Sequence, residues 1–128
     1  MSDTKGRTAS ENTLRERTKV FAIRIIRLFT ALPKNSVAQV IGKQLLRSGS
    51  SVGAHYREAQ RSRSPAEFIS KIEVAIQELE ESDYWIELLI ECEIVKGERL
   101  SELKQEVQEL LAMLTASVRT VKNKRKQV

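Results

Sequence analysis

Apolar residues recur every three or four positions along most of the chain, and this spacing predicts amphipathic α-helices. We predict four of them, over about residues 13–32, 36–61, 65–94 and 98–121. Pro33 and Gly97 fall between these segments, where they interrupt a helix. No stretch alternates apolar and polar residues as a half-buried strand does. The pattern therefore predicts an all-α protein.

The starts of the predicted helices carry capping signals. Thr13 and Glu16 fit a capping box, and Ser36 can cap the second helix. Residues 64–67 (SPAE) combine an N-cap serine, a proline at the first helical position and a glutamate at the third. Four helices of 20–30 residues with short connections predict an antiparallel, up-down four-helix bundle. Residues 1–12 are then a flexible N-terminal segment and residues 122–128 a basic C-terminal tail.

The segment 47–54 (RSGSSVGA) has the composition of a loop, because each glycine inside a helix costs up to about 1 kcal/mol relative to alanine. Apolar spacing nevertheless continues through Val52 and Tyr56, so we predict a helix. Gly49 and Gly53, four residues apart, then form a smooth face that another helix can approach closely.

The first helix carries more apolar surface than one bundle contact needs. Beside its core positions it has a second apolar row, Ala22, Ile26 and Phe29, whereas a surface helix needs one stripe. The segment 65–94 is also long enough to extend past shorter partners. Both features indicate self-association, which an unchanged monomer mass in light scattering would contradict.

Charge is unevenly distributed along the chain. The net charge is +5, from 22 Lys and Arg against 17 Asp and Glu. Residues 1–66 carry a net +9, residues 67–118 a net −9, and residues 119–128 a net +5 with no acidic residue. A basic balance favours an anionic partner such as nucleic acid. The two halves can also neutralise each other, and the terminal tail is the segment without an acidic neighbour.

The candidate nucleic-acid contacts are arginines and lysines, because these bind phosphate oxygens. They comprise Arg17, Arg24, Arg27, Arg57, Arg61, Arg63, Arg119, Lys122, Lys124, Arg125 and Lys126. An alternative stays open for the arginines after residue 56, since acidic residues nearby can neutralise them. The chain has six aromatic residues, and we place Tyr84 and Trp85 in the core, so base stacking has little support.

The residues give no catalytic or metal site. One cysteine and one histidine cannot form an internal disulfide or a zinc site within one chain. We interpret Ser51, His55, Glu58 and Asp83 as a polar network between helices rather than as an acid–base cluster. Helical ribonucleases of the HEPN type have four to six residues between an arginine and a histidine, whereas Arg47 and His55 have seven. We therefore expect no enzyme and no cofactor.

No membrane-spanning segment is expected. The longest uncharged runs are less than half of the roughly 20 residues that a membrane helix needs. The amino terminus lacks the apolar core of a secretory signal. These features predict a cytoplasmic protein.

Residues 47–89 (RSGSSVGAHYREAQRSRSPAEFISKIEVAIQELEESDYWIELL) resemble the four helix bundle protein family, also called the 23S rRNA-intervening-sequence protein family. The similarity includes these positions: Gln44, Leu45, Arg47, Ser48, Gly49, Ser51, Gly53, Ala54, Glu58, Ala59, Glu67, Phe68, Lys71, Tyr84 and Trp85. With the first helix and its proline turn, it covers about residues 14–115. In the family motif GANYREA the third position is an asparagine, and here it is His55.

The resemblance implies an antiparallel four-helix bundle that assembles as a ring-like homopentamer. Some members of the family are encoded in intervening sequences of bacterial 23S rRNA genes, and relatives serve as accessory proteins of retroelements that bind nucleic acid and a reverse transcriptase. The family's molecular function is not established for most members, and no catalytic residue is carried over. We therefore expect a non-enzymatic oligomer that binds RNA or DNA, with a protein-binding adaptor as the alternative.

Overall fold

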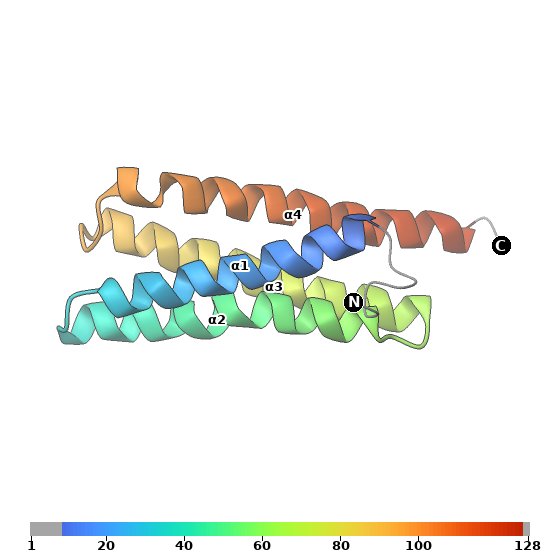
Figure 1. Cartoon of the computed structure of the whole chain (residues 1–128), viewed down its shortest axis with the longest axis horizontal. Helices are drawn as coiled ribbons and strands as arrows, with labels where there is room; N and C mark the ends of the chain where they lie inside the picture. Colours follow the sequence, from blue (N-terminus) through green and yellow to red (C-terminus); the bar gives the residue numbers. More distant parts are fainter. Residues whose placement is uncertain (1–8, 127–128) are drawn as a thin grey trace.

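The computed structural model describes the backbone of residues 9–126 and the side chains of residues 13–126. It contains four helices: α1 (Ala9–Ala31), α2 (Ser36–Gln60), α3 (Pro65–Glu91) and α4 (Gly97–Lys126). They lie alongside one another as a bundle (Figure 1). The described residues include no β-strand. The prediction of an all-α protein with four helices is confirmed.

The connections divide between the two ends of the bundle. Figure 1 shows the α1–α2 and α3–α4 connections at one end, and the α2–α3 connection at the other end, where the last turns of α4 also lie. α1 packs on α2, α2 on α3 and α3 on α4, while α1 and α4 contact each other less extensively. The end that holds the α2–α3 connection, with residues 57–71 and 119–126, is called the basic end.

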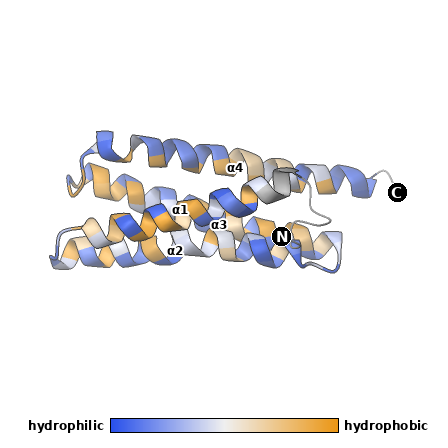
Figure 2. Cartoon of the chain, viewed as in Figure 1, coloured by the Kyte–Doolittle hydropathy of each residue, from blue (hydrophilic) through white to orange (hydrophobic). Residues whose placement is uncertain are grey.

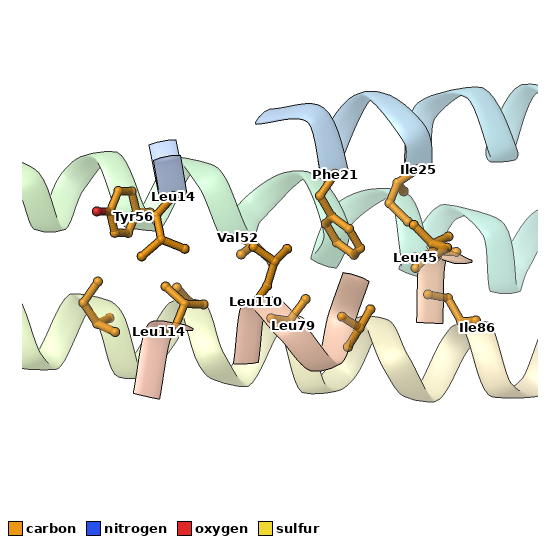
Figure 3. Packing of buried hydrophobic residues seen from close by; sticks show 14 of the residues in the cluster. Leu14, Phe21, Ile25, Leu45, Val52, Tyr56, Leu79, Ile86, Leu110 and Leu114 are labelled. Atoms are coloured by element: carbon orange, nitrogen blue, oxygen red, sulfur yellow. The ribbon is translucent and has the colours of Figure 1, made fainter. Parts of the chain in front are cut away.

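A single apolar core runs along the bundle axis between all four helices (Figure 3). Its largest fully buried side chains include Tyr56, Phe21 and Leu14. The core positions of α4 follow one another at 3–4 spacing: Leu100, Leu103, Val107, Leu110, Leu114 and Val118 are all buried. Burial of this kind is the main source of stability in a helical bundle.

The helix starts agree with the sequence signals at one boundary and differ at two. Ser64 caps α3, since its hydroxyl accepts a hydrogen bond from the Glu67 backbone N–H at 3.1 Å. The cap of α2 is Asn35, not Ser36, because the extended backbone of Asn35 lets its side chain accept from the Ala38 N–H. α1 begins at Ala9, so Thr13 lies inside the helix and not at its cap.

The glycine-containing segment is helical, as predicted, and α1 lies close against it. A Cβ atom on Gly49 would come within 2.8 Å of the Ile25 side chain, and one on Gly53 within 3.1 Å of Thr18. Gly42 continues this face, where a Cβ would come within 2.6 Å of Leu32. Larger side chains at these positions would force α1 away from α2.

The ends of α3 and α4 differ from the prediction. α3 stops at Glu91 instead of about residue 94, because the chain turns through a left-handed residue, Glu93, with φ of 58°. α4 continues to Lys126, so residues 122–126 of the expected tail belong to the helix. Residues 1–8 and 127–128 lie outside the described part of the chain.

Candidate nucleic-acid interface

The α2–α3 connection carries three arginines at the basic end. Arg57 occupies the last turn of α2, Arg61 is its C-cap, and Arg63 lies in the turn. The turn is held by the Arg63 backbone N–H, which donates to the Glu67 carboxylate at 3.0 Å. Among the described side chains, none of these three guanidinium groups forms an ion pair. They are available to an anion from solution.

A shallow pocket of about 380 Å³ opens at this turn. It is lined by Arg61, Arg63 and Lys71 together with Glu58 and Glu67. The Lys71 ammonium lies 3.6 Å from Glu58. Lys71 did not figure among the candidates from sequence, although it lies one turn after the capping glutamate and so faces the same corner. Three cations against two carboxylates leave the pocket positive.

The last turns of α4 add five further basic side chains, all exposed: Arg119, Lys122, Lys124, Arg125 and Lys126. Lys122 lies 3.8 Å from Glu73 of α3, and this ion pair joins the last turns of α4 to α3. Within residues 13–126 the other four form no ion pair. Figure 1 shows this end of α4 at the same end of the bundle as the α2–α3 connection and extending past it. The fold thus brings two basic segments to one end.

The opposite end has a different balance of charge. Residues 57–71 and 119–126, at the basic end, carry nine basic and two acidic side chains. Residues 80–102, which approach and form the α3–α4 connection, carry two basic and eight acidic ones. The α1–α2 connection adds Lys34 at that opposite end. The bundle is therefore strongly positive at one end only.

The structure separates the α1 candidates from the basic end. Arg17 is engaged: its guanidinium donates to both oxygens of Glu106, at 2.6 and 3.0 Å, and to Glu109 at 2.7 Å. These carboxylates raise the pKa of Arg17, and Arg17 lowers the pKa of Glu109. Arg24 and Arg27 lie further along α1, toward the α1–α2 connection, and neither pairs with a described carboxylate.

Arg47 forms a second cross-helix cluster. Its guanidinium donates to Glu81 and lies 3.3 Å from Glu78, both on α3. The Trp85 indole N–H donates to the same Glu81 at 2.9 Å, and together with Arg47 it lowers the pKa of that carboxyl. Arg47 thus joins α2 to α3 with its charge neutralised.

The expected polar network is divided between two places. The His55 Nδ1 lies 3.2 Å from Glu58, and the two share a face as the spacing indicated. This contact, followed by Lys71, lowers the pKa of Glu58. The Ser51 hydroxyl instead donates to the Arg47 carbonyl one turn earlier, and Asp83 faces Lys104 of α4 at 3.6 Å. Asp83 therefore does not meet the histidine.

The buried polar contact between α2 and α3 is a pair of serines outside the four residues predicted for the network; Ser82 was expected to face His55, but it meets Ser48. The hydroxyls of Ser48 and Ser82 lie 2.9 Å apart and are fully buried. Ser82 also donates to the Glu78 carbonyl at 2.8 Å. The apolar spacing of α3 places Ser82 in the core, and this spacing is the sequence signal that indicates a buried serine.

The expected core position of Tyr84 is wrong. Its side chain is 54% exposed, and its ring meets the half-buried Trp85 edge-on at 5.1 Å between centroids. The reason is helical phase: with Leu79, Ser82 and Ile86 inward, residue 84 points outward.

The described residues hold neither a metal-binding cluster nor a membrane-spanning helix. No group of three His, Cys, Asp or Glu side chains there is arranged to hold a metal ion. None of the helices in residues 9–126 has a stretch apolar and long enough to cross a bilayer.

Comparison with known proteins identifies the family. Residues 10–116 match the family model described as 23S rRNA-intervening sequence protein. None of the curated proteins compared with this chain matches it. A crystal structure of a protein with unknown function from the S23 ribosomal protein family of Bacteroides thetaiotaomicron is similar, with 34% sequence identity and a TM-score of 0.81 over 86% of this chain and 98% of that one. The family model covers α1 from its second residue, all of α2 and α3 and the first two thirds of α4, and the chain belongs to the 23S rRNA-intervening sequence protein family.

Proposed function

We propose that this protein is a non-enzymatic nucleic-acid-binding bundle that contacts phosphates through the basic end, with RNA as the favoured ligand. The observation that carries the proposal is the set of unpaired cations that the fold gathers there: Arg57, Arg61, Arg63, Arg119, Lys124, Arg125 and Lys126. Unpaired arginines and lysines of this kind bind phosphate oxygens without reading bases. The family description, which names 23S rRNA, supports RNA over DNA.

The proposal includes assembly of several copies. The alternation of the connections between the two ends supports an antiparallel, up-down order, and the exposed apolar residues of α1 support self-association into the homopentamer that the family resemblance implies. Several copies would multiply the number of phosphate contacts. We continue to predict that the protein is located in the cytoplasm.

The test is fluorescence anisotropy with a short labelled RNA, in single-stranded and hairpin forms. Affinity should fall about a hundredfold between about 50 and 200 mM salt if about five phosphates are neutralised. Arg61→Gln/Arg63→Gln and Lys124→Gln/Arg125→Gln/Lys126→Gln should each weaken binding and flatten the salt dependence. An absence of RNA and DNA binding at low salt would contradict the proposal.

The matched control is Lys96→Gln/Arg99→Gln, which removes two exposed basic side chains at the opposite end of the bundle. Neither residue forms an ion pair with a described side chain. The control should bind RNA as the unmodified protein does. Equal losses in the control and in the basic-end variants would mean that total charge, rather than the basic end, determines binding.

A second candidate function is a protein-binding adaptor, such as an accessory protein of a reverse transcriptase. The exposed aliphatic residues of α1 and the exposed ring of Tyr84 favour it, because apolar surface of this kind marks protein contacts. An adaptor would show no salt-dependent RNA binding in the same assay.

A further inference from the structure

Over residues 20–27 the outward face of α1 is largely apolar and carries no carboxylate; the nearest on this helix, Glu16, lies one turn before Val20 and faces Lys19. Val20, Ile23 and Ile26 are 42%, 36% and 45% exposed. Arg24 and Arg27 lie beside them, and neither has an ion-pair partner among the side chains described. Figure 2 shows hydrophobic colours along this part of α1. These five residues are called the α1 stripe.

The outward face of α3 has the opposite character. Glu80, Tyr84, Glu87 and Glu91 follow one another at helical spacing, and all four are exposed. None of the three carboxylates pairs with a cation of residues 13–126. These residues are called the α3 stripe. It offers negative charge around one large aromatic ring.

The two stripes complement each other in charge and in chemistry. The arginines of the α1 stripe match the carboxylates of the α3 stripe, and Arg24 or Arg27 can also lie over the ring of Tyr84. The aliphatic side chains give the remaining apolar surface. Apart from the half-buried Arg24, every residue of both stripes is exposed on its own chain, so the stripes do not cover each other there. Only a second copy can bring them together.

We propose that the α1 stripe of one copy docks on the α3 stripe of the next. This inference rests on the self-association that is part of the proposed function, and it specifies which surfaces meet. The contact joins two different surfaces, so each copy keeps one free stripe until a ring closes. Symmetric pairing is disfavoured, because α1 against α1 places arginine on arginine and α3 against α3 places glutamate on glutamate.

Charge reversal tests the proposed contact. Arg24→Glu/Arg27→Glu and Glu80→Lys/Glu87→Lys, each made alone, should weaken self-association by at least about tenfold, since like charges then face each other. The chain that carries all four substitutions should associate again, because the complementarity is restored with exchanged signs. The measurement is molar mass by light scattering across a dilution series, with circular dichroism to verify that each variant is folded.

The matched control reverses two other exposed carboxylates of the acidic region, Glu98→Lys/Glu102→Lys, and should leave the molar mass unchanged. If the α1 reversal dissociates the protein but the α3 reversal does not, the proposed pairing of surfaces is wrong while self-association stands. If the unmodified protein is a monomer throughout the series, both fail. RNA binding through the basic end is measured separately and with other residues, so its outcome is independent.

Discussion

Single residues determine how closely α1 approaches α2. At Gly49 an added Cβ would meet the Cγ1, Cγ2 and Cβ atoms of Ile25 at 2.8–3.3 Å, and a β-branched side chain in a helix has little freedom to rotate away. We expect Gly49→Ala to lower the free energy of unfolding by about 1–2 kcal/mol. The steric cost of overpacking then exceeds the gain of up to about 1 kcal/mol in helix propensity. Urea denaturation measures the difference.

A control and a second variant separate these two effects. Ser50→Ala, at the exposed neighbouring position, should change the stability little. If the clash with Ile25 is the cause, the double variant Ile25→Ala/Gly49→Ala should lose less stability than the sum of the two single losses. Additive losses would show that Gly49 is needed for another reason.

The ion pairs of Arg17 predict a stability difference that depends on pH. Because Arg17 lowers the pKa of Glu109 in the folded state, this contribution is present above the carboxyl's unfolded-state pKa and is lost as the pH falls through its folded-state pKa. Arg17→Met should lower the free energy of unfolding by about 1 kcal/mol at pH 7, since its bidentate contact with the mostly buried Glu106 exceeds a typical surface pair. The difference should shrink in acid, below about pH 4.

Denaturation at neutral and at acidic pH checks this expectation. Lys19→Met is the matched control, because Lys19 lies 3.9 Å from Glu16 in an exposed pair on α1 itself. It should have almost no effect at either pH. A loss for Arg17→Met that is equal at both pH values would assign the effect to packing of the arginine stem instead.

For single residues, the sequence predicted contacts within one helix better than the partner of a residue on another helix. The smooth glycine face and the His55–Glu58 contact depend on spacing within one helix, which 3.6 residues per turn fixes. The partner of Asp83 depends on the rotation of α3 in the bundle, and that rotation is set by packing against two helices at once. Its contact with Lys104 was therefore not predictable from spacing alone.

The end of α3 shows how an element can stop without glycine. The Glu93 N–H donates to the Ile90 carbonyl and the Ile94 N–H to the Leu89 carbonyl, which is the pattern of a Schellman motif with Glu93 at its left-handed position. Glycine takes this conformation without the Cβ penalty. We expect Glu93→Gly to raise the free energy of unfolding by up to about 1 kcal/mol, since the relief of strain exceeds the cost of the conformational entropy that glycine adds to the unfolded chain.

The matched control is the same substitution two residues earlier. Glu91→Gly lies in the last helical turn, where glycine should lower the stability by up to about 1 kcal/mol. Thermal unfolding followed by circular dichroism gives both values. Opposite signs are expected, and a loss of stability in both variants would mean that the Glu93 side chain makes a favourable contribution of its own.

The helices themselves were predictable, whereas their ends were less so. Capping chemistry fixes the start of α3 because Ser64, Pro65 and Glu67 all act locally. The stop at Glu91 and the continuation of α4 to Lys126 depend on other causes. Ile94 and Val95 pack against the core, so the chain must leave the axis of α3 and turn toward the bundle after Glu91. No local sequence pattern indicates this packing. In α4 a run of good helix formers continues the helix into the basic segment.

For the whole molecule, the fold converts a charge pattern along the chain into a difference between the two ends. Residues 57–71 and 119–126 lie far apart in sequence, and the bundle places both at the basic end (Figure 1). The sequence identified most of these residues as candidates. Only the arrangement of the helices shows that these residues converge at one end. It also shows that Arg17 is not available to a ligand, because it pairs with Glu106 and Glu109.

The unequal contacts between helices predict unequal stability within the bundle. α2 and α3 have the most extensive contact, whereas α1 is held mainly by α2 and meets α4 over a smaller surface. We expect amides in the middle of α1, near Ile25, to exchange with solvent through a partial opening that costs less free energy than global unfolding. Amides near Leu79 of α3 should exchange only through global unfolding.

Native-state hydrogen exchange with increasing denaturant distinguishes the two. Arg17→Met should speed exchange near Ile25 by more than it speeds exchange near Leu79, since the ion pairs it removes hold α1 to α4. Uniform protection of α1 and α3 would show that the bundle opens only as a whole. If the α1 stripe is covered by a second copy, protection near Ile25 should also rise with protein concentration, while protection at the free basic end should not.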